Sequence, residues 1–123
     1  ISVKDEDKSQ LKTLCTKLKG LGFKFIATKG TGLKMKDDGF EVKIINKVME
    51  GRPHIVDAIL NNEVSMVINT TEGRQSIKDS YSIRRSALEH SVFLTTTISG
   101  GFAIVESLEQ GEKVWSYDAL QNS

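Results

Sequence analysis

What this sequence has little of excludes several classes of protein. A single cysteine, Cys15, rules out an internal disulfide among the 123 residues and fits a cytoplasmic setting. The 17 basic and 16 acidic residues leave a net charge of +1, unlike the strongly basic surface of a nucleic-acid-binding protein. No apolar run approaches the roughly 18 residues that a membrane span needs. We therefore expect neither nucleic acid nor membrane among the partners of this chain.

The length and the first residues predict one domain taken from a larger protein. A chain of 123 residues is long enough to build one hydrophobic core without disulfides or metal ions to stabilise it. Ile1-Ser2-Val3 reads as the tail of a first strand and has no initiator methionine before it. We interpret residues 1–123 as a single domain, a fragment of a longer chain.

Apolar periodicity predicts strands that alternate with helices. Such alternation indicates an α/β fold with a mostly parallel sheet covered by helices on both faces. The expected strands after Ile1–Val3 are Phe23–Ala27, Phe40–Ile45, Val64–Ile68 and Val92–Leu94, with Glu112–Ser116 as a last edge strand. The expected helices are Lys8–Lys19, Leu33–Lys36, Pro53–Leu60, Gln75–Glu89 (continuous, or restarted at Tyr81) and Phe102–Leu108.

Three local features refine this assignment. Asp5 or Asp7 is expected to cap the helix that begins at Lys8, because a carboxylate oxygen accepts from free N–H groups at a helix start. Pro53, the only proline, suits the first turn of its helix. Cys15 lies on the apolar stripe of the first helix, which predicts a core thiol rather than a reactive one.

Polar residues follow most of the predicted strands. The apolar run Val64–Ile68 changes abruptly into Asn69-Thr70-Thr71-Glu72-Gly73-Arg74, and such turns between a strand and a helix are where open α/β sheets bind ligands. Free N–H groups, hydroxyls and an arginine suit a phosphate, although polar turns also cap helices for purely structural reasons. Because the ends of parallel strands lie along one edge, we expect one site for a phosphorylated molecule. The strand ends that converge there carry Thr28 and Thr31, Asn46 and Lys47, Asn69 and Thr71, and Thr95–Thr97.

The residues needed for catalysis or metal binding are missing from these strand ends. A catalytic site needs a positioned base or nucleophile, and the nearest carboxylate is Glu72, within the turn itself. His54 is expected to be a packing or surface residue, with no second histidine or cysteine nearby to complete a metal site. We predict a binding site without catalytic or metal-binding residues. The Arg84-Arg85 pair fits either a solvated ion-pair face or a contact with another domain or subunit.

Three long stretches closely resemble the C-terminal allosteric domain of the carbamoyl phosphate synthetase large chain. They are Asn46–Ile55 (NKVMEGRPHI), Ile68–Arg74 (INTTEGR) and Asp79–Leu88 (DSYSIRRSAL). Gly100–Ala103 and the opening Ile1–Thr31 continue the resemblance, so it covers nearly the whole chain. It implies a methylglyoxal-synthase-like fold, a three-layer α/β/α sandwich with a five-stranded parallel sheet.

The resemblance also implies a function. In that family the domain catalyses nothing and needs no cofactor, but binds nucleotide effectors such as UMP or IMP. It thereby regulates a parent enzyme that uses ATP, with Mg or Mn, to make carbamoyl phosphate for pyrimidine and arginine biosynthesis. The implied partners are the synthetase domains of the parent chain and a small glutaminase subunit, and self-association is a further expectation.

The resemblance assigns residues to the effector site. The residues expected at the phosphate are Lys8, Thr28, Thr31 and Lys47, with Asn69, Thr71 and Arg74 toward the rest of the nucleotide and Ser2 as an addition. Most of these positions coincide with the polar strand ends that the pattern of residues indicates independently.

Departures from the family pattern limit the choice of effector. Leu94 and Thr95 stand where enterobacterial-type domains offer tyrosine and aspartate to ornithine, so activation by ornithine is not expected. Animal relatives bind N-acetylglutamate, but Lys8 and Lys47 favour a phosphate. The enzyme alternative is a methylglyoxal-synthase-type lyase acting on dihydroxyacetone phosphate. That reaction needs an aspartate base, and the strand before Asn69 ends without one.

Overall fold

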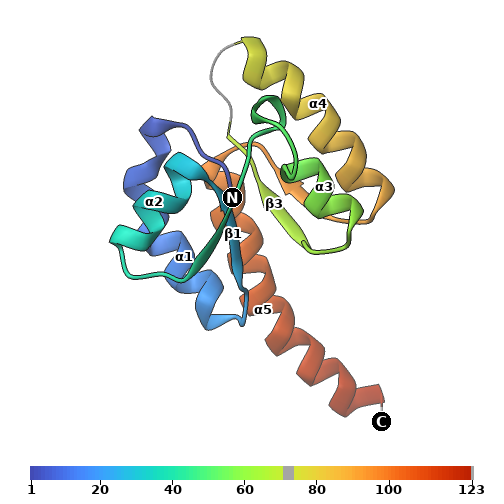
Figure 1. Cartoon of the computed structure of the whole chain (residues 1–123). Helices are drawn as coiled ribbons and strands as arrows, with labels where there is room; N and C mark the ends of the chain where they lie inside the picture. Colours follow the sequence, from blue (N-terminus) through green and yellow to red (C-terminus); the bar gives the residue numbers. More distant parts are fainter. Residues whose placement is uncertain (71–73, 123) are drawn as a thin grey trace.

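Helices and strands alternate along the chain, which confirms the predicted α/β class (Figure 1). The computed structural model describes residues 1–70 and 74–122, and the side chains of residues 1–70 and 80–110. A short 3-10 helix, η1 (Asp5–Gln10), leads into α1 (Leu11–Gly20). The following elements are β1 (Phe25–Thr28), α2 (Lys29–Asp37), β2 (Val42–Ile45), the 3-10 helix η2 (Val48–Glu50), α3 (Ile55–Leu60), β3 (Met66–Ile68), α4 (Arg74–Glu89), β4 (Phe93–Thr95) and α5 (Ile98–Asn122).

The sheet consists of two parallel pairs of strands joined by the first residues of the chain. β1 pairs with β2, and β3 pairs with β4. Ile1 and Ser2 lie between β1 and β3, so the order across the sheet is β2, β1, the Ile1-Ser2 segment, β3 and β4. The joining hydrogen bonds run from Ile1 N to Ile26 O (2.7 Å), Thr28 N to Ile1 O (3.2 Å), Ser2 N to Ile68 O (2.9 Å) and Thr70 N to Ser2 O (2.9 Å).

The number of strands is smaller than expected. Among the described residues four strands are present rather than five, because the first residues pair with β3 only through an isolated parallel bridge between Ser2 and Asn69. The predicted edge strand Glu112–Ser116 is wrong, since these residues continue α5. Glu112 and Lys113 favour a helix, and once α5 has begun each further residue extends it at little cost. Neither α5 nor any other helix within the described ranges is long and apolar enough to cross a membrane.

Two predicted helix starts are also wrong. Asp5 and Asp7 lie inside η1 and do not cap α1, because η1 runs directly into α1 and the N–H of Leu11 already donates to Lys8 O. Pro53 precedes α3 instead of opening it, and the peptide bond between Arg52 and Pro53 is cis.

Helix α2 is longer than predicted. It begins at Lys29, so the glycine-containing residues expected to form a turn before Leu33 make up its first turn. Gly32 is buried there, and a Cβ at this position would collide with the Cδ1 of Ile44 on β2. Close packing of α2 against the sheet therefore outweighs the low intrinsic helix propensity of glycine.

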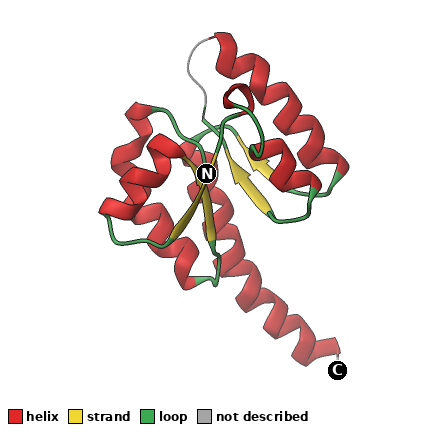
Figure 2. Cartoon of the chain, in the orientation of Figure 1, coloured by secondary structure: helices red, strands yellow, loops and turns green. Residues whose placement is uncertain are grey.

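Helices cover both faces of the sheet, as Figure 2 shows. Ile68 packs with α1, α2 and α5 in a cluster that includes Leu14, Met35 and Val105. Its neighbour Val67 belongs to a second cluster, with Ile59 of α3 and Ile83 of α4. Successive side chains of a strand point to opposite faces, so the two clusters are the two helix–sheet interfaces of a three-layer fold.

Candidate functional site

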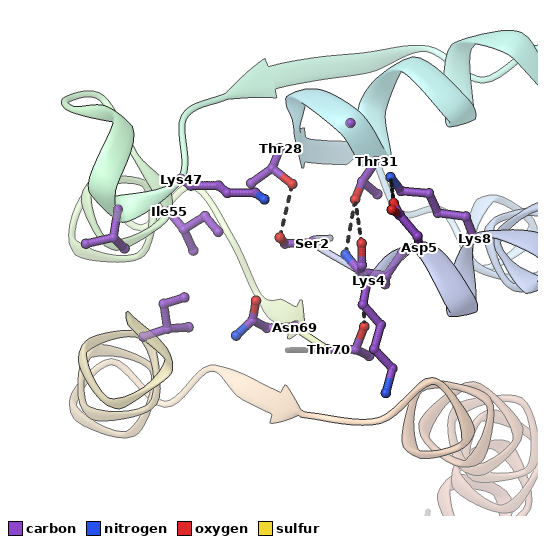
Figure 3. A pocket seen from close by; sticks show the side chains of 14 residues that line it. Ser2, Lys4, Asp5, Lys8, Thr28, Thr31, Lys47, Ile55, Asn69 and Thr70 are labelled. Carbon is purple, nitrogen blue, oxygen red and sulfur yellow. Dashed lines mark hydrogen bonds and ion pairs between the residues drawn. The ribbon is translucent and has the colours of Figure 1, made fainter. Parts of the chain in front are cut away.

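A cavity of about 330 Å³ opens at the edge where the parallel strands end (Figure 3). Its volume lies within the usual range for small-molecule sites. The walls come from the first residues, η1, the β1–α2 junction, η2, α3, the residues after β3, and α4. The described lining residues are Ser2, Val3, Lys4, Asp5, Lys8, Thr28, Gly30, Thr31, Lys47, Val48, Ile55, Asn69, Thr70 and Ile83.

Five of the seven predicted site residues line this cavity. They are Lys8, Thr28, Thr31, Lys47 and Asn69. Thr71 and the side chain of Arg74 lie outside the described part of the chain, so their contribution stays a prediction. Asn69 lies within the sheet's bridge to Ser2, which fixes it at the cavity wall.

The expectation that four strand ends converge is wrong for β4. Thr95–Thr97 are not among the described lining residues. Thr97 instead caps the start of α5, because its Oγ1 accepts a hydrogen bond of 2.9 Å from the N–H of Gly100. Asn46 is likewise absent from the described lining, although its neighbour Lys47 is present.

The start of α2 gives one side of the cavity a positive character. The first N–H groups of a helix have no partner within the helix, and the helix dipole favours an anion beside them. Gly30, in this first turn, lines the cavity, and a Cβ there would lie 3.2 Å from the Nζ of Lys8. The ammonium group of Lys8 and the start of α2 therefore act on the same small volume.

The threonine hydroxyls also hold the first residues of the chain in place. Thr28 and Ser2 share a hydrogen bond of 3.0 Å between their hydroxyls, which uses one of the two hydroxyl protons and leaves the other for a ligand. Thr31 Oγ1 accepts from Val3 N at 3.1 Å and donates to Val3 O at 3.4 Å. The proton of Thr31 is thus already engaged, and a ligand would have to compete with Val3 for it.

Lys47 stands on a loop that a buried carboxylate holds. Its N–H donates to Glu50 Oε1 at 2.7 Å, which fixes the start of η2. Farther along the loop, Asp57 of α3 accepts hydrogen bonds from Arg52 and from the N–H of His54. The backbone of His54 thus takes part in the hydrogen bonds that hold this loop. His54 is not among the described residues that line the cavity.

Asp5 is the one carboxylate among the described lining residues, which include no histidine or cysteine. It accepts a hydrogen bond of 2.5 Å from the Nζ of Lys8. The pKa of Asp5 lies below its usual value, first because of this hydrogen bond and then because of the charges of Lys8 and Lys47. A carboxylate held in this way is a weak base. Within the described residues there is also no cluster of three or more His, Cys, Asp or Glu that could hold a metal ion.

Reasoning from strand ends missed part of the lining. Thr70 lines the cavity, and its Oγ1 accepts a hydrogen bond of 2.8 Å from the N–H of Lys4. An apolar group, Val48, Ile55 and Ile83, completes the wall. Thr70 belongs to the polar turn after Ile68 that the sequence indicated, but it was not assigned to the site individually. The apolar residues belong to elements whose relative placement the sequence does not reveal.

Comparison with known proteins identifies the family. A family model described as "MGS-like domain" matches residues 10–96. The chain belongs to the MGS-like domain family. This match confirms the fold class that the sequence resemblance implied.

Relatives of this MGS-like domain are much longer proteins. The carbamoyl phosphate synthase large chain of Pseudomonas putida is 56% identical over 111 residues, which is 90% of this chain and 10% of that protein. The protein of the same name from Xanthomonas axonopodis pv. citri is 48% identical over 122 residues, 98% of this chain and 11% of that protein. The MGS-like domain therefore spans about a tenth of the length of these relatives, and the predicted resemblance to part of the large chain is confirmed.

Proposed function

We propose that this MGS-like domain is a non-catalytic module that binds a phosphorylated nucleotide, UMP or IMP, at the carboxyl edge of its sheet. The observation that carries the proposal is the cavity lined by Lys8, Lys47 and the first turn of α2. Two ammonium groups beside a helix start favour a doubly charged phosphate. Each charge-assisted hydrogen bond contributes about 1.5–3 kcal/mol to binding.

The other end of the cavity supports the choice of a nucleotide over a bare phosphate. Figure 3 shows the ammonium end of Lys47 pointing toward Thr28, whereas Ile55 lies near the backbone end of Lys47, on the side of the cavity away from Lys8. Val48 and Ile83 line the cavity as well. Such apolar surface suits a flat base, and Asn69 supplies an amide that can both donate and accept hydrogen bonds.

The regulated reaction is ATP-dependent synthesis of carbamoyl phosphate by a longer parent chain, whose other domains and small glutaminase subunit are the partners. The names of the relatives and the small share of their length that this chain covers support this step. A bound nucleotide orders the loops around Lys8 and Lys47, which then contact a synthetase domain. Only the difference in affinity between two states is transmitted, so the coupling is on the order of 1–3 kcal/mol.

Calorimetry with UMP, IMP and N-acetylglutamate tests the binding step. We expect saturable nucleotide binding that Lys47→Ala weakens tenfold or more, roughly 1.4 kcal/mol. Lys36→Ala is the matched control, because Lys36 is exposed on α2 and not among the described lining residues. Binding of N-acetylglutamate alone, or equal effects of the two variants, would overturn the phosphate site. In the full-length parent protein, Lys47→Ala should shift the nucleotide response to at least tenfold higher nucleotide concentration.

The methylglyoxal-synthase-type lyase is the competing function. Its proton abstraction needs a carboxylate base, and Asp5, the one described candidate, is paired with Lys8. An assay with dihydroxyacetone phosphate separates the two functions, since we expect no release of methylglyoxal. Turnover that Asp5→Asn abolishes would replace the binding proposal with a catalytic one.

A further inference from the structure

The cavity contains its own anion. Asp5 lines it together with Lys8 and Lys47, and its Oδ1 lies 2.5 Å from the Nζ of Lys8. Lys47 is close enough for its charge to favour the ionised form of Asp5 as well. The carboxylate of Asp5 thus makes the kind of contact with Lys8 that a phosphate oxygen would make.

The two partners of this ion pair are exposed to different degrees. The side chain of Asp5 is 87% exposed, whereas that of Lys8 is 26% exposed. Asp5 can therefore turn away into water at little cost, while Lys8 stays against the first turn of α2 near Gly30. An exposed ion pair of this type contributes little stability, so a doubly charged ligand can displace the carboxylate.

We propose that Asp5 is an internal competitor that pairs with Lys8 and must leave it before a phosphate group binds. The inference rests on the proposed function, because it assumes that Lys8 contacts the phosphate. Asp5 then lowers the affinity in two ways, by occupying a donor and by repelling the incoming anion. The wild-type protein consequently responds to a higher range of effector concentrations than its lysines alone would set.

Removing the charge of Asp5 tests the proposed competition. Asp5→Asn keeps the size of the side chain, and we expect it to bind UMP and inorganic phosphate about threefold to fivefold more tightly than the wild type, the upper part of the range for one exposed charge contact. Asp5→Glu restores the charge and should return the affinity toward that of the wild type. The affinities of both variants and the wild type for UMP and for phosphate are measured by calorimetry at low, fixed ionic strength, because salt screens contacts between charges.

Glu6→Gln is the matched control. Glu6 is the neighbouring residue in η1, is exposed and is not among the described lining residues, so this variant makes the same change in net charge away from the cavity. We expect its affinity for UMP to stay within about twofold of the wild type. Uridine, which lacks the phosphate, provides a second control, because Asp5→Asn should not tighten its binding.

The outcomes separate this inference from the proposed function. If the wild type binds UMP and Asp5→Asn binds it no more tightly than Glu6→Gln does, the proposed competition by Asp5 is wrong. The proposed nucleotide site is then unaffected. Equal tightening of uridine would likewise overturn the proposed competition, since the effect would not involve the phosphate. If neither the wild type nor Asp5→Asn binds either probe, both proposals fail. Thermal unfolding without ligand checks that each variant is folded.

Discussion

Arg52 donates two hydrogen bonds to the same oxygen of Asp57, from Nε at 3.0 Å and from Nη2 at 2.8 Å. The other oxygen of Asp57 accepts from the N–H of His54 at 2.9 Å. One nearly buried carboxylate on α3 thus holds the end of the loop that begins with Lys47. The hydrogen bonds from Arg52, and next the one from His54, lower the pKa of Asp57.

This relationship predicts how stability depends on pH. A carboxyl whose pKa is lowered in the folded state stabilises the protein above its unfolded pKa of about 3.9, and the effect is lost as the pH falls through the lower folded value. Asp57→Asn should therefore be less stable than the wild type at pH 7. The difference in unfolding free energy should shrink as the pH falls below about 4. Urea unfolding across this range checks it, with Asp37→Asn as an exposed control; a difference that is constant with pH would contradict the assignment.

Thr28 links stability and binding. Thr28→Val keeps the shape of the side chain but removes the hydroxyl that pairs with Ser2. We expect the unfolding free energy to fall by about 1 kcal/mol, the usual contribution of one hydrogen bond. UMP should also bind several-fold more weakly, because the hydroxyl pair at the cavity is lost. Thr13→Val, at an exposed position on α1, should change neither quantity.

The core between α1 and the sheet should be sensitive to truncation. Leu14 is fully buried in the cluster that joins α1, β1, β3 and α5. Leu14→Ala should lower the unfolding free energy by about 2–5 kcal/mol, through lost burial and the cavity left behind. Leu33 is 52% exposed, so Leu33→Ala should cost less than about 1 kcal/mol. Chemical denaturation measures both, and equal losses would argue against this packing.

Two helical glycines should respond to alanine with opposite signs. Gly20, in the last turn of α1, has no neighbouring atom within 4 Å of an added Cβ, so Gly20→Ala should stabilise the protein by about 0.5–1 kcal/mol. Gly100, in the first turn of α5, faces the hydroxyls of Thr95 and Thr97, and a Cβ there would collide with Thr95 Oγ1. Gly100→Ala should therefore destabilise by about 1–3 kcal/mol. Thermal melts distinguish the two, and a rise in both would show that Thr95 moves aside freely.

The candidate site could be predicted from sequence where it depends on neighbours in the chain. Thr28, Lys47 and Asn69 each come directly after, or within two residues of, an apolar strand, so their place at the strand ends follows from local pattern. The Thr95–Thr97 run has the same pattern but is not part of the described lining, and Thr97 instead caps the start of α5. Only the three-dimensional arrangement separates these two cases.

The sequence by itself determined the α/β class, the family, most helices and strands, and five residues that line the cavity. These depend on hydrophobic period and on short motifs, which are properties of residues close together in the chain. The tertiary structure decided that Ser2 bridges the two halves of the sheet, that Gly32 lies within α2, and that Val48, Ile55 and Ile83 form one wall. It also decided that Lys47 lines the same cavity as Asp5 and Lys8, because contacts between distant segments depend on packing and strand order, which no local pattern encodes.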